Sequence, residues 1–255
     1  IAAYAPAGKT IPIVSSEWGY TTCNMSAPAC GYAGVPQVTQ AKYLARMWLT
    51  NAAAGVQLST FYDWKDDGTN ASYTEDNYGT VTTNFSVVKP AYTAAATLQT
   101  TLGDSNTTIG RVAAAVTPAS PTPAQPTDLF VVAFASSASP GGTNIAAWSN
   151  LTFCAAPPPP AATDCGYAGI TEPACLARGC CFNEYPAPGA ATPQCFFPAP
   201  PVTLQFTLPP SPAAPGHCFS AAVDYYGVVH APPPCASPAG VVTLNVTDGP
   251  LYLRW

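Results

Sequence analysis

Acidic and aromatic side chains follow two short apolar runs in the first part of this sequence. Glu17 comes just after the run at residues 11–14, and Trp64 comes just after the run at 56–62. Side chains at the carboxyl ends of parallel strands converge, and a carboxylate placed there can act as a nucleophile or transfer a proton. The same stretch also holds Asp63, Asp66, Asp67 and Glu75. The simpler alternatives are a structural acid for Glu17, core packing for Trp64 and a solvated loop for the aspartates.

Strand and helix patterns alternate around these residues. Residues 11–14 predict a short buried strand, and residues 56–62 predict a second one. Between them a helix is predicted that ends near Gly55, and another is predicted over 91–102. The first of these helices is indicated by the spacing of Ala41, Leu44, Ala45, Trp48 and Leu49. Because two strands joined by a helix form a right-handed parallel crossover, we expect α/β architecture with both strand faces buried.

The sequence changes character after Gly103. A proline-rich stretch at 117–127 precedes alternating runs that predict the antiparallel strands of a β-sandwich. These runs are DLFVVAFAS, TNIAAWSN, VTLQFTL, CFSAAVDYYG, GVVTLNVTD and PLYLRW. Between the second and the third, residues 154–195 contain six of the ten cysteines. This density predicts a small disulfide-rich module inserted into the sandwich.

Composition excludes several classes of function. Charged residues make up 8% of the chain and the net charge is −5, which argues against nucleic-acid binding. No run of 18 apolar residues occurs, so no membrane span is predicted. Ten cysteines beside two histidines indicate disulfides rather than metal ligands, and we expect neither a metal nor a cofactor.

Glycosylation signals point to the same compartment as the cysteines. The N-x-S/T pattern occurs at Asn24, Asn70, Asn84, Asn106, Asn150 and Asn245. Six acceptors in a cysteine-rich chain predict a secreted, extracellular protein.

Several motifs, taken in order, resemble the last two βα units of clan A glycoside hydrolases, the retaining cellulase-like barrels. They are EWGY, QAKYLARMWLTNAAAG, STFYDWKDDG, TEDNYGTV and VKPAYTAAATLQTTLG, and the later VTDGPLYLRW resembles the β-domain that follows such barrels. The resemblance implies a (β/α)8 barrel in which Glu17 is the nucleophile and Trp64 a platform for a sugar ring. It also implies that Asp63, Asp66, Asp67 and Glu75 are substrate-binding residues that line or brace the same loop.

The resemblance leaves half of the catalytic pair unaccounted for. In the family the acid/base Glu follows the fourth strand, often in an Asn-Glu pair, and this chain has no fourth barrel strand. Its Asn183-Glu184 pair lies inside the cysteine-rich insert. Two parallel strands cannot close a barrel, so we expect the chain alone to be inactive. An N-terminal barrel segment, on the same precursor or on another chain, would complete the site.

The cysteine-rich insert resembles a trefoil (P-type) module. The resemblance rests on CGYAGIT, RGCCF and CFFP, with Cys154 upstream. Six cysteines allow fifteen pairings. The family connectivity implies Cys154–Cys181, Cys165–Cys180 and Cys175–Cys195, and it leaves Cys23–Cys30 and Cys218–Cys235 to pair locally. Gln194 replaces the tryptophan that such modules use to bind glycans, so sugar binding by this module does not follow.

The expected organisation is therefore α/β followed by all-β. Residues 1–103 would be the last βα units of a barrel, 104–153 and 199–255 a β-sandwich, and 154–198 the trefoil module. The first functional hypothesis is retaining hydrolysis of a β-linked glycan. The Ala/Pro/Ser/Thr-rich segments resemble extracellular glycoproteins of algae and plants. A second hypothesis is therefore an inactive, glycosylated subunit of an extracellular matrix or filament, in which copies of the chain could assemble with one another. A third is a carbohydrate-binding protein.

Overall fold

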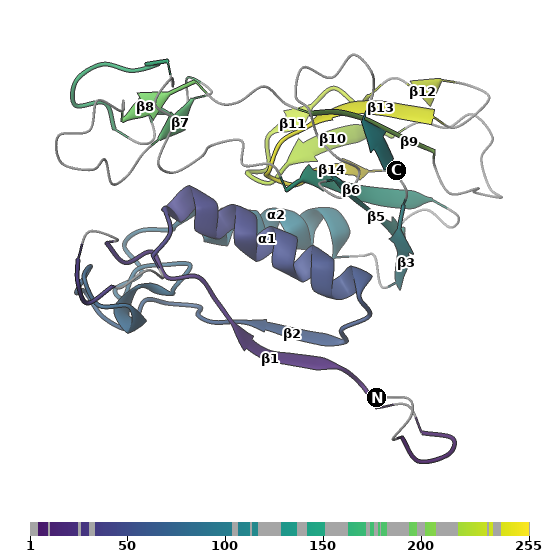
Figure 1. The fold of residues 1–255 in the computed structure, drawn as a ribbon, viewed down its shortest axis with the longest axis horizontal. Helices are drawn as coiled ribbons and strands as arrows, with labels where there is room; N and C mark the ends of the chain where they lie inside the picture. The colour runs from purple at the N-terminus through teal and green to yellow at the C-terminus, as the bar shows by residue number, and fades with distance from the viewer. Residues whose placement is uncertain are drawn as a thin grey trace.

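The fold is layered, as seen in a computed structural model of the chain (Figure 1). From one side to the other, the layers are a parallel strand pair, two helices, a six-stranded sheet and a four-stranded sheet. The residues that the structure describes are 5–9, 11–24, 27–30, 34–103, 107–112, 114–116, 129–136, 142–150, 163–171, 174–175, 178, 180–182, 194–197, 202–207, 219–233, 235–236 and 241–254.

The first layer consists of β1 (Val14–Trp18) and β2 (Leu58–Phe61), which run parallel. The second is the connecting helix α1 (Gln37–Ala53) and the later helix α2 (Pro90–Leu102), which packs against it. Pro90 opens α2, where its missing N–H leaves no hydrogen bond unmade. Gly55 follows α1 with φ +73°, the left-handed conformation in which glycine is favoured as a helix stop.

The strand pair corrects one expectation. Both of its faces were expected to be buried, but the register partners Val14 and Leu58 are 49% and 56% exposed, because the helices cover only one face. The described residues supply two parallel strands, and these do not form a barrel.

The six-stranded sheet has the order β11-β10-β14-β6-β5-β3 and is antiparallel throughout. Its strands are β3 (Thr107–Arg111), β5 (Leu129–Ala135), β6 (Thr143–Ser149), β10 (Ala221–Asp224), β11 (Val229–His230) and β14 (Leu251–Arg254). The four-stranded sheet, order β12-β13-β9-β4, consists of β4 (Ala114–Val116), β9 (Val202–Thr207), β12 (Cys235–Ala236) and β13 (Val241–Val246). All six predicted runs contain strands, whereas β3, β4, β11 and β12 were not predicted.

The central strands of the six-stranded sheet are buried on both faces, whereas the edge strand β11 is exposed. One face packs on the four-stranded sheet through residues such as Val131, Ile145 and Leu204. The other face packs on α1 and α2, with Trp148 and Tyr252 contributing the largest buried side chains. The sheet is therefore the central layer of the molecule, and its strands β5 and β6 are almost continuously buried rather than alternating.

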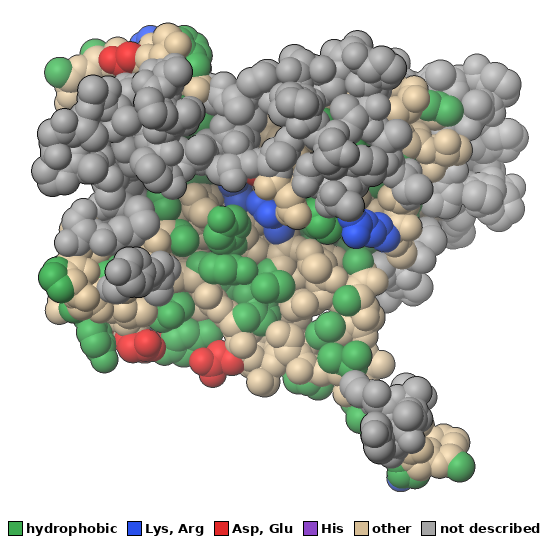
Figure 2. Space-filling view, viewed as in Figure 1, with side chains coloured by type: hydrophobic (Ala, Val, Ile, Leu, Met, Phe, Trp, Pro, Cys, Tyr) green, Lys and Arg blue, Asp and Glu red, His purple; other side chains and the backbone are tan. Residues whose placement is uncertain are grey.

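A buried ion pair links the helical layer to the sandwich. Lys42 Nζ of α1 lies 2.9 Å from Asp248 Oδ1, in the turn before β14, and both side chains are less than 10% exposed. Arg46, one helical turn further on, donates to Asn150 Oδ1 at 2.7 Å. Figure 2 shows Lys and Arg side chains in this seam, while acidic side chains lie away from it, at the lower edge and at the upper left of the same view.

The described residues of the cysteine-rich insert lie apart from these layers (Figure 1). The insert contains the short antiparallel pair β7 (Cys181–Phe182) and β8 (Cys195–Phe196), and its core contains Ile170 and the disulfides Cys165–Cys180 and Cys175–Cys195. A third disulfide joins Cys23 to Cys30 in the loop after β1. Cys181 is disulfide-bonded. Cys154 and Cys218 lie outside the described residues, so their predicted pairings with Cys181 and Cys235 stay predictions.

Candidate functional site

Glu17 lies on the open face of the parallel strand pair. The register between β1 and β2 shifts between Ser15 and Trp18, which is a β-bulge with Ser16 and Glu17 at the extra position. Ser16 and Glu17 are both exposed, while Ser15 and Trp18 are half-buried against the helices. The bulge thus turns the Glu17 carboxylate away from the helices, at the carboxyl end of its strand.

Trp18 fixes the opposite face of the same strand. Its indole N–H donates to Ser59 Oγ of β2 at 2.9 Å, and its ring packs edge-on against Trp48 of α1 and Phe61 of β2. These contacts anchor the residue next to Glu17 and so hold the bulge in place.

The loop between β2 and α2 is held by a buried ion pair. Asp66 Oδ1 lies 2.6 Å from Lys89 Nζ and accepts the backbone N–H of Gly79 at 2.9 Å. Lys89 also donates to Thr22 Oγ1 and to the carbonyl of Asn77, which ties the loops after both strands together. Burial raises the pKa of Asp66, against the lowering influence of Lys89. Asp66 is 5% exposed and braces the loop, which is one of the two roles expected for it, and its part in substrate binding stays a prediction.

Two tyrosines missed by the sequence analysis lie among the remaining acids. Tyr62 and Tyr78 pack edge-on with ring centroids 5.3 Å apart. The pKa of Tyr78 is raised by burial and then by the charges of Glu75 and Glu17. The pKa of Tyr62 is raised to about 12 by burial and by its hydrogen bond to Asp67 Oδ2 at 3.2 Å. Both phenols therefore stay protonated at neutral pH, as hydrogen-bond donors close to carboxylates.

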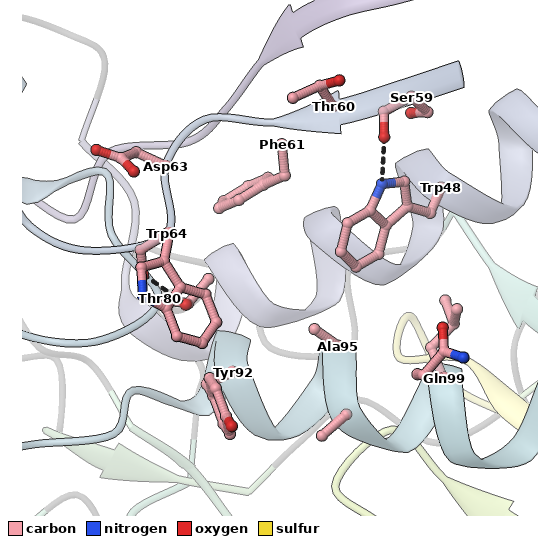
Figure 3. A pocket seen from close by; sticks show the side chains of 12 residues that line it. Trp48, Ser59, Thr60, Phe61, Asp63, Trp64, Thr80, Tyr92, Ala95 and Gln99 are labelled. Atoms are coloured by element: carbon pink, nitrogen blue, oxygen red, sulfur yellow. Dashed lines mark hydrogen bonds between the residues drawn. The ribbon is translucent and has the colours of Figure 1, made fainter. Parts of the chain in front are cut away.

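Trp64 belongs to a separate hollow beside the strand pair. Its indole is 57% exposed and lies 5.4 Å from the ring of Tyr92 on α2, centroid to centroid. Together they border a pocket of about 550 Å³ between β2 and α2, which Figure 3 shows from close by. Phe61 and Trp48 form its apolar floor, and Asp63 lies at the end near Trp64. A pocket of this size with aromatic walls suits an apolar or amphipathic ligand.

The predicted residues thus fall into three groups. Glu17, Asp67 and Glu75 are exposed near the two tyrosines, Trp64 and Asp63 border the pocket, and Asp66 is buried. The tyrosines had a signal in the sequence, because Tyr62 directly follows a strand and Tyr78 lies in TEDNYGTV.

Other predicted sites are also located by the structure. Asn70, Asn84, Asn150 and Asn245 are exposed, Asn24 is half-buried, and Asn106 lies outside the described residues. The sulfur atoms of Cys165, Cys180 and Cys195 lie within 4.8 Å of one another, but each is in a disulfide and offers no thiolate to a metal. No helix in the described ranges is long and apolar enough to cross a membrane.

Comparison with known proteins identifies one domain and one related fold. Residues 154–198 match the trefoil (P-type) domain family and form a domain of this kind. Trefoil domains and multiple disulfides are typical of extracellular proteins. No curated protein matches the chain.

Among solved structures, the chain is similar to a family 39 glycoside hydrolase from the gut symbiont Bacteroides cellulosilyticus WH2, with a TM-score of 0.54 and 17% sequence identity. The match covers 96% of this chain and 34% of that one, so the chain spans about a third of the length of the solved structure. At this identity the similarity concerns the fold alone.

Proposed function

We propose that the chain is the carboxyl-terminal part of a secreted glycoside-hydrolase-like protein and supplies Glu17 as the nucleophile for retaining hydrolysis of a β-linked glycan. The observation that carries this proposal is the placement of Glu17. It is an exposed carboxylate at a bulge, at the carboxyl end of a parallel strand, on a face that the described residues leave open.

The open face also supports completion by further βα units. The register partners Val14 and Leu58 present apolar side chains there, and each strand of the pair has one neighbour among the described strands. Exposed apolar area beside free strand edges is a surface that other strands would cover. We propose that the complement is a barrel segment carrying the acid/base carboxyl group, on the same polypeptide or on another one.

In the proposed reaction Glu17 attacks the anomeric carbon while the second carboxylic acid, about 5–5.5 Å away, protonates the leaving oxygen. Water then releases the sugar from Glu17, assisted by the same second group acting as a base. Tyr78, kept protonated, would donate a hydrogen bond at the carboxylate or at the sugar, whereas the Tyr62 hydroxyl donates to Asp67. Trp64 would stack on a sugar ring, and Asp63, Asp67 and Glu75 would accept hydrogen bonds from sugar hydroxyls.

Covalent labelling tests the nucleophile. A 2-fluoro sugar with an activated leaving group, applied to the chain together with its barrel complement, should form an ester with Glu17 that peptide mapping locates. Glu17→Gln should abolish the label, and the matched Glu184→Gln, in the cysteine-rich insert, should retain it. Label on another residue, or none while β-glucan is being hydrolysed, would refute the assignment.

A glycosylated structural subunit is the second candidate, favoured by the four exposed asparagine acceptors and the proline-rich segments. Dense sugar on asparagine and proline, with no acid/base Glu in the complement, would support it. Glycan binding without product release would instead support a carbohydrate-binding protein. Intact mass with peptide mapping distinguishes a structural subunit from the hydrolase. A product assay distinguishes a carbohydrate-binding protein from the hydrolase.

A further inference from the structure

A second aromatic hollow lies in the seam between the helices and the sandwich. It has a volume of about 390 Å³ and is bordered by α1 on one side and by β5 and β6 on the other. We call it the seam groove, and its lining residues are Tyr20, Tyr43, Arg46, Met47, Thr50, Phe130, Trp148 and Asn150.

The walls of the seam groove have the chemistry of a sugar site. Tyr43 and Tyr20 pack edge-on at 5.0 Å, and the ring of Phe130 stacks on Trp148 at 5.0 Å with an interplanar angle of 7°. Arg46 lies over the Tyr43 ring at 5.4 Å. Trp148 is 1% exposed and Arg111 lies over the Phe130 ring at 4.3 Å, so these two rings form an apolar wall and do not offer open faces to a ligand. An aromatic wall beside the fixed Arg46 cation suits a ligand that has both apolar and polar surfaces, such as a pyranose ring.

Asn150 lies at the rim of the groove, just after β6. Its Oδ1 accepts a hydrogen bond from Arg46 Nη2 at 2.7 Å, and Arg46 Nη1 also reaches the carbonyl of Asp248. A guanidinium has donors only, so the amide atom that faces it is the oxygen. The amide nitrogen is therefore directed away from Arg46, and Asn150 itself is exposed.

The sequence places an acceptor motif at this same residue, Asn150-Leu151-Thr152. An N-linked glycan is attached through Nδ2 and leaves Oδ1 free, so the bond to Arg46 is compatible with the modification. The occupant of the groove is thus indicated by a residue that lines it.

We propose that Asn150 carries an N-linked glycan whose first N-acetylglucosamine residues lie in the seam groove. The Nδ2–C1 bond forms as the bond between C1 and a lipid pyrophosphate donor breaks, and the displaced amide proton neutralises the departing pyrophosphate. The docked sugar contacts α1 and the sandwich together, and it fastens the two layers beside the Lys42–Asp248 pair. The inference rests on secretion, which is part of the proposed function, but not on hydrolase activity.

The test uses protein secreted from a eukaryotic cell line, with glycan occupancy read by peptide mapping. An amidase that cleaves the bond between asparagine and N-acetylglucosamine is then applied to the native protein. Release at Asn150 should be at least about tenfold slower than at Asn70, a ratio that corresponds to about 1.4 kcal/mol of docking. Tyr43→Ala should remove this difference in release rate. If the Tyr43→Ala variant does not fold, Tyr20→Ala is used in its place.

Two sequon variants provide a readout of stability. Thr152→Ala removes the glycan but keeps Asn150 and its bond to Arg46, and it should lower Tm by about 2–4 °C. Ser72→Ala is the matched control, because it removes the Asn70 glycan while the recorded contact to Asn70 uses the Ser72 backbone N–H. Its Tm should not change.

Three results would overturn the proposal. They are an unmodified Asn150 in protein that carries sugar at Asn70, equal release rates at the two sites, and equal Tm values for Thr152→Ala and the parent. Absence of sugar from every acceptor would overturn it together with secretion. The fluoro-sugar label on Glu17 is independent of all four results.

Discussion

Replacing Lys89 with methionine should destabilise the loop between β2 and α2 in a pH-dependent manner. In the native protein Lys89 Nζ lies 2.6 Å from Asp66 Oδ1, and both side chains are less than 10% exposed. Lys89→Met keeps most of the aliphatic stem but leaves Asp66 with the Gly79 N–H as its remaining recorded partner. Removing one member of a buried pair costs about 3–5 kcal/mol, because the other charge stays buried without compensation.

The pH dependence follows from the pKa of Asp66. Burial already raises this pKa above 3.8, and Lys89 opposes the rise, so the variant should have a still higher folded-state pKa. Between the unfolded and folded pKa values the folded state binds more protons, and stability therefore increases as the pH falls through that window. The loss caused by Lys89→Met should be largest near neutral pH and should shrink on acidification, by at most about 1.4 kcal/mol per pH unit.

Urea unfolding of the parent and variant across a pH series measures this difference in the free energy of unfolding. The contributions of the other titrating groups largely cancel, because both proteins contain them. The double variant Asp66→Asn/Lys89→Met removes both charges, so it should lose less stability than Lys89→Met and show little added pH dependence. A loss that is constant with pH, or a double variant less stable than the single one, would refute the reasoning.

Three further predictions concern the strand ends and the seam. Asp67→Asn should lower the pKa of Tyr62 from about 12 toward 10.0, as followed by NMR of labelled tyrosine. In the parent protein the raised pKa means that the free energy of unfolding falls as the pH rises from 10.0 to about 12. Lys42→Met should cost about 3–5 kcal/mol by stranding the buried Asp248 carboxylate, as measured by urea unfolding, whereas Lys42→Met/Asp248→Asn should cost less. Gly19→Ala should force the ends of β1 and β2 apart, because a Cβ would collide with the Tyr62 carbonyl oxygen; unchanged thermal stability would contradict this contact.

Local sequence patterns predicted the helices and most strands. The spacing of Ala41, Leu44 and Leu49 indicated α1, and these residues are buried in the structure. The patterns did not indicate the order of the layers. β5 and β6 are buried on both faces because α1 and α2 cover the side that an isolated sandwich would expose to water.

The candidate site was harder to predict because its geometry depends on distant partners. Glu17 was identified from its position after a strand, but its exposure results from a bulge that no residue type marks. Asp66 and Asp67 are neighbours with opposite environments. The difference arises from Lys89, 23 residues further along the chain, which donates to Asp66, whereas Asp67 accepts from Tyr62 at the exposed side of the loop.

The order of strands in the central sheet has a consequence for biosynthesis. β14 lies between β10 and β6, yet it is the last strand of that sheet to leave the ribosome. It also supplies Tyr252 to the contact with the helices and Leu253 to the contact with the other sheet. The helices and strands that precede β14 can therefore form during translation, but neither core is complete until β14 arrives. The nascent chain consequently exposes the apolar faces of β5 and β6 from their synthesis until β14 is made, the interval in which we expect chaperones to be needed.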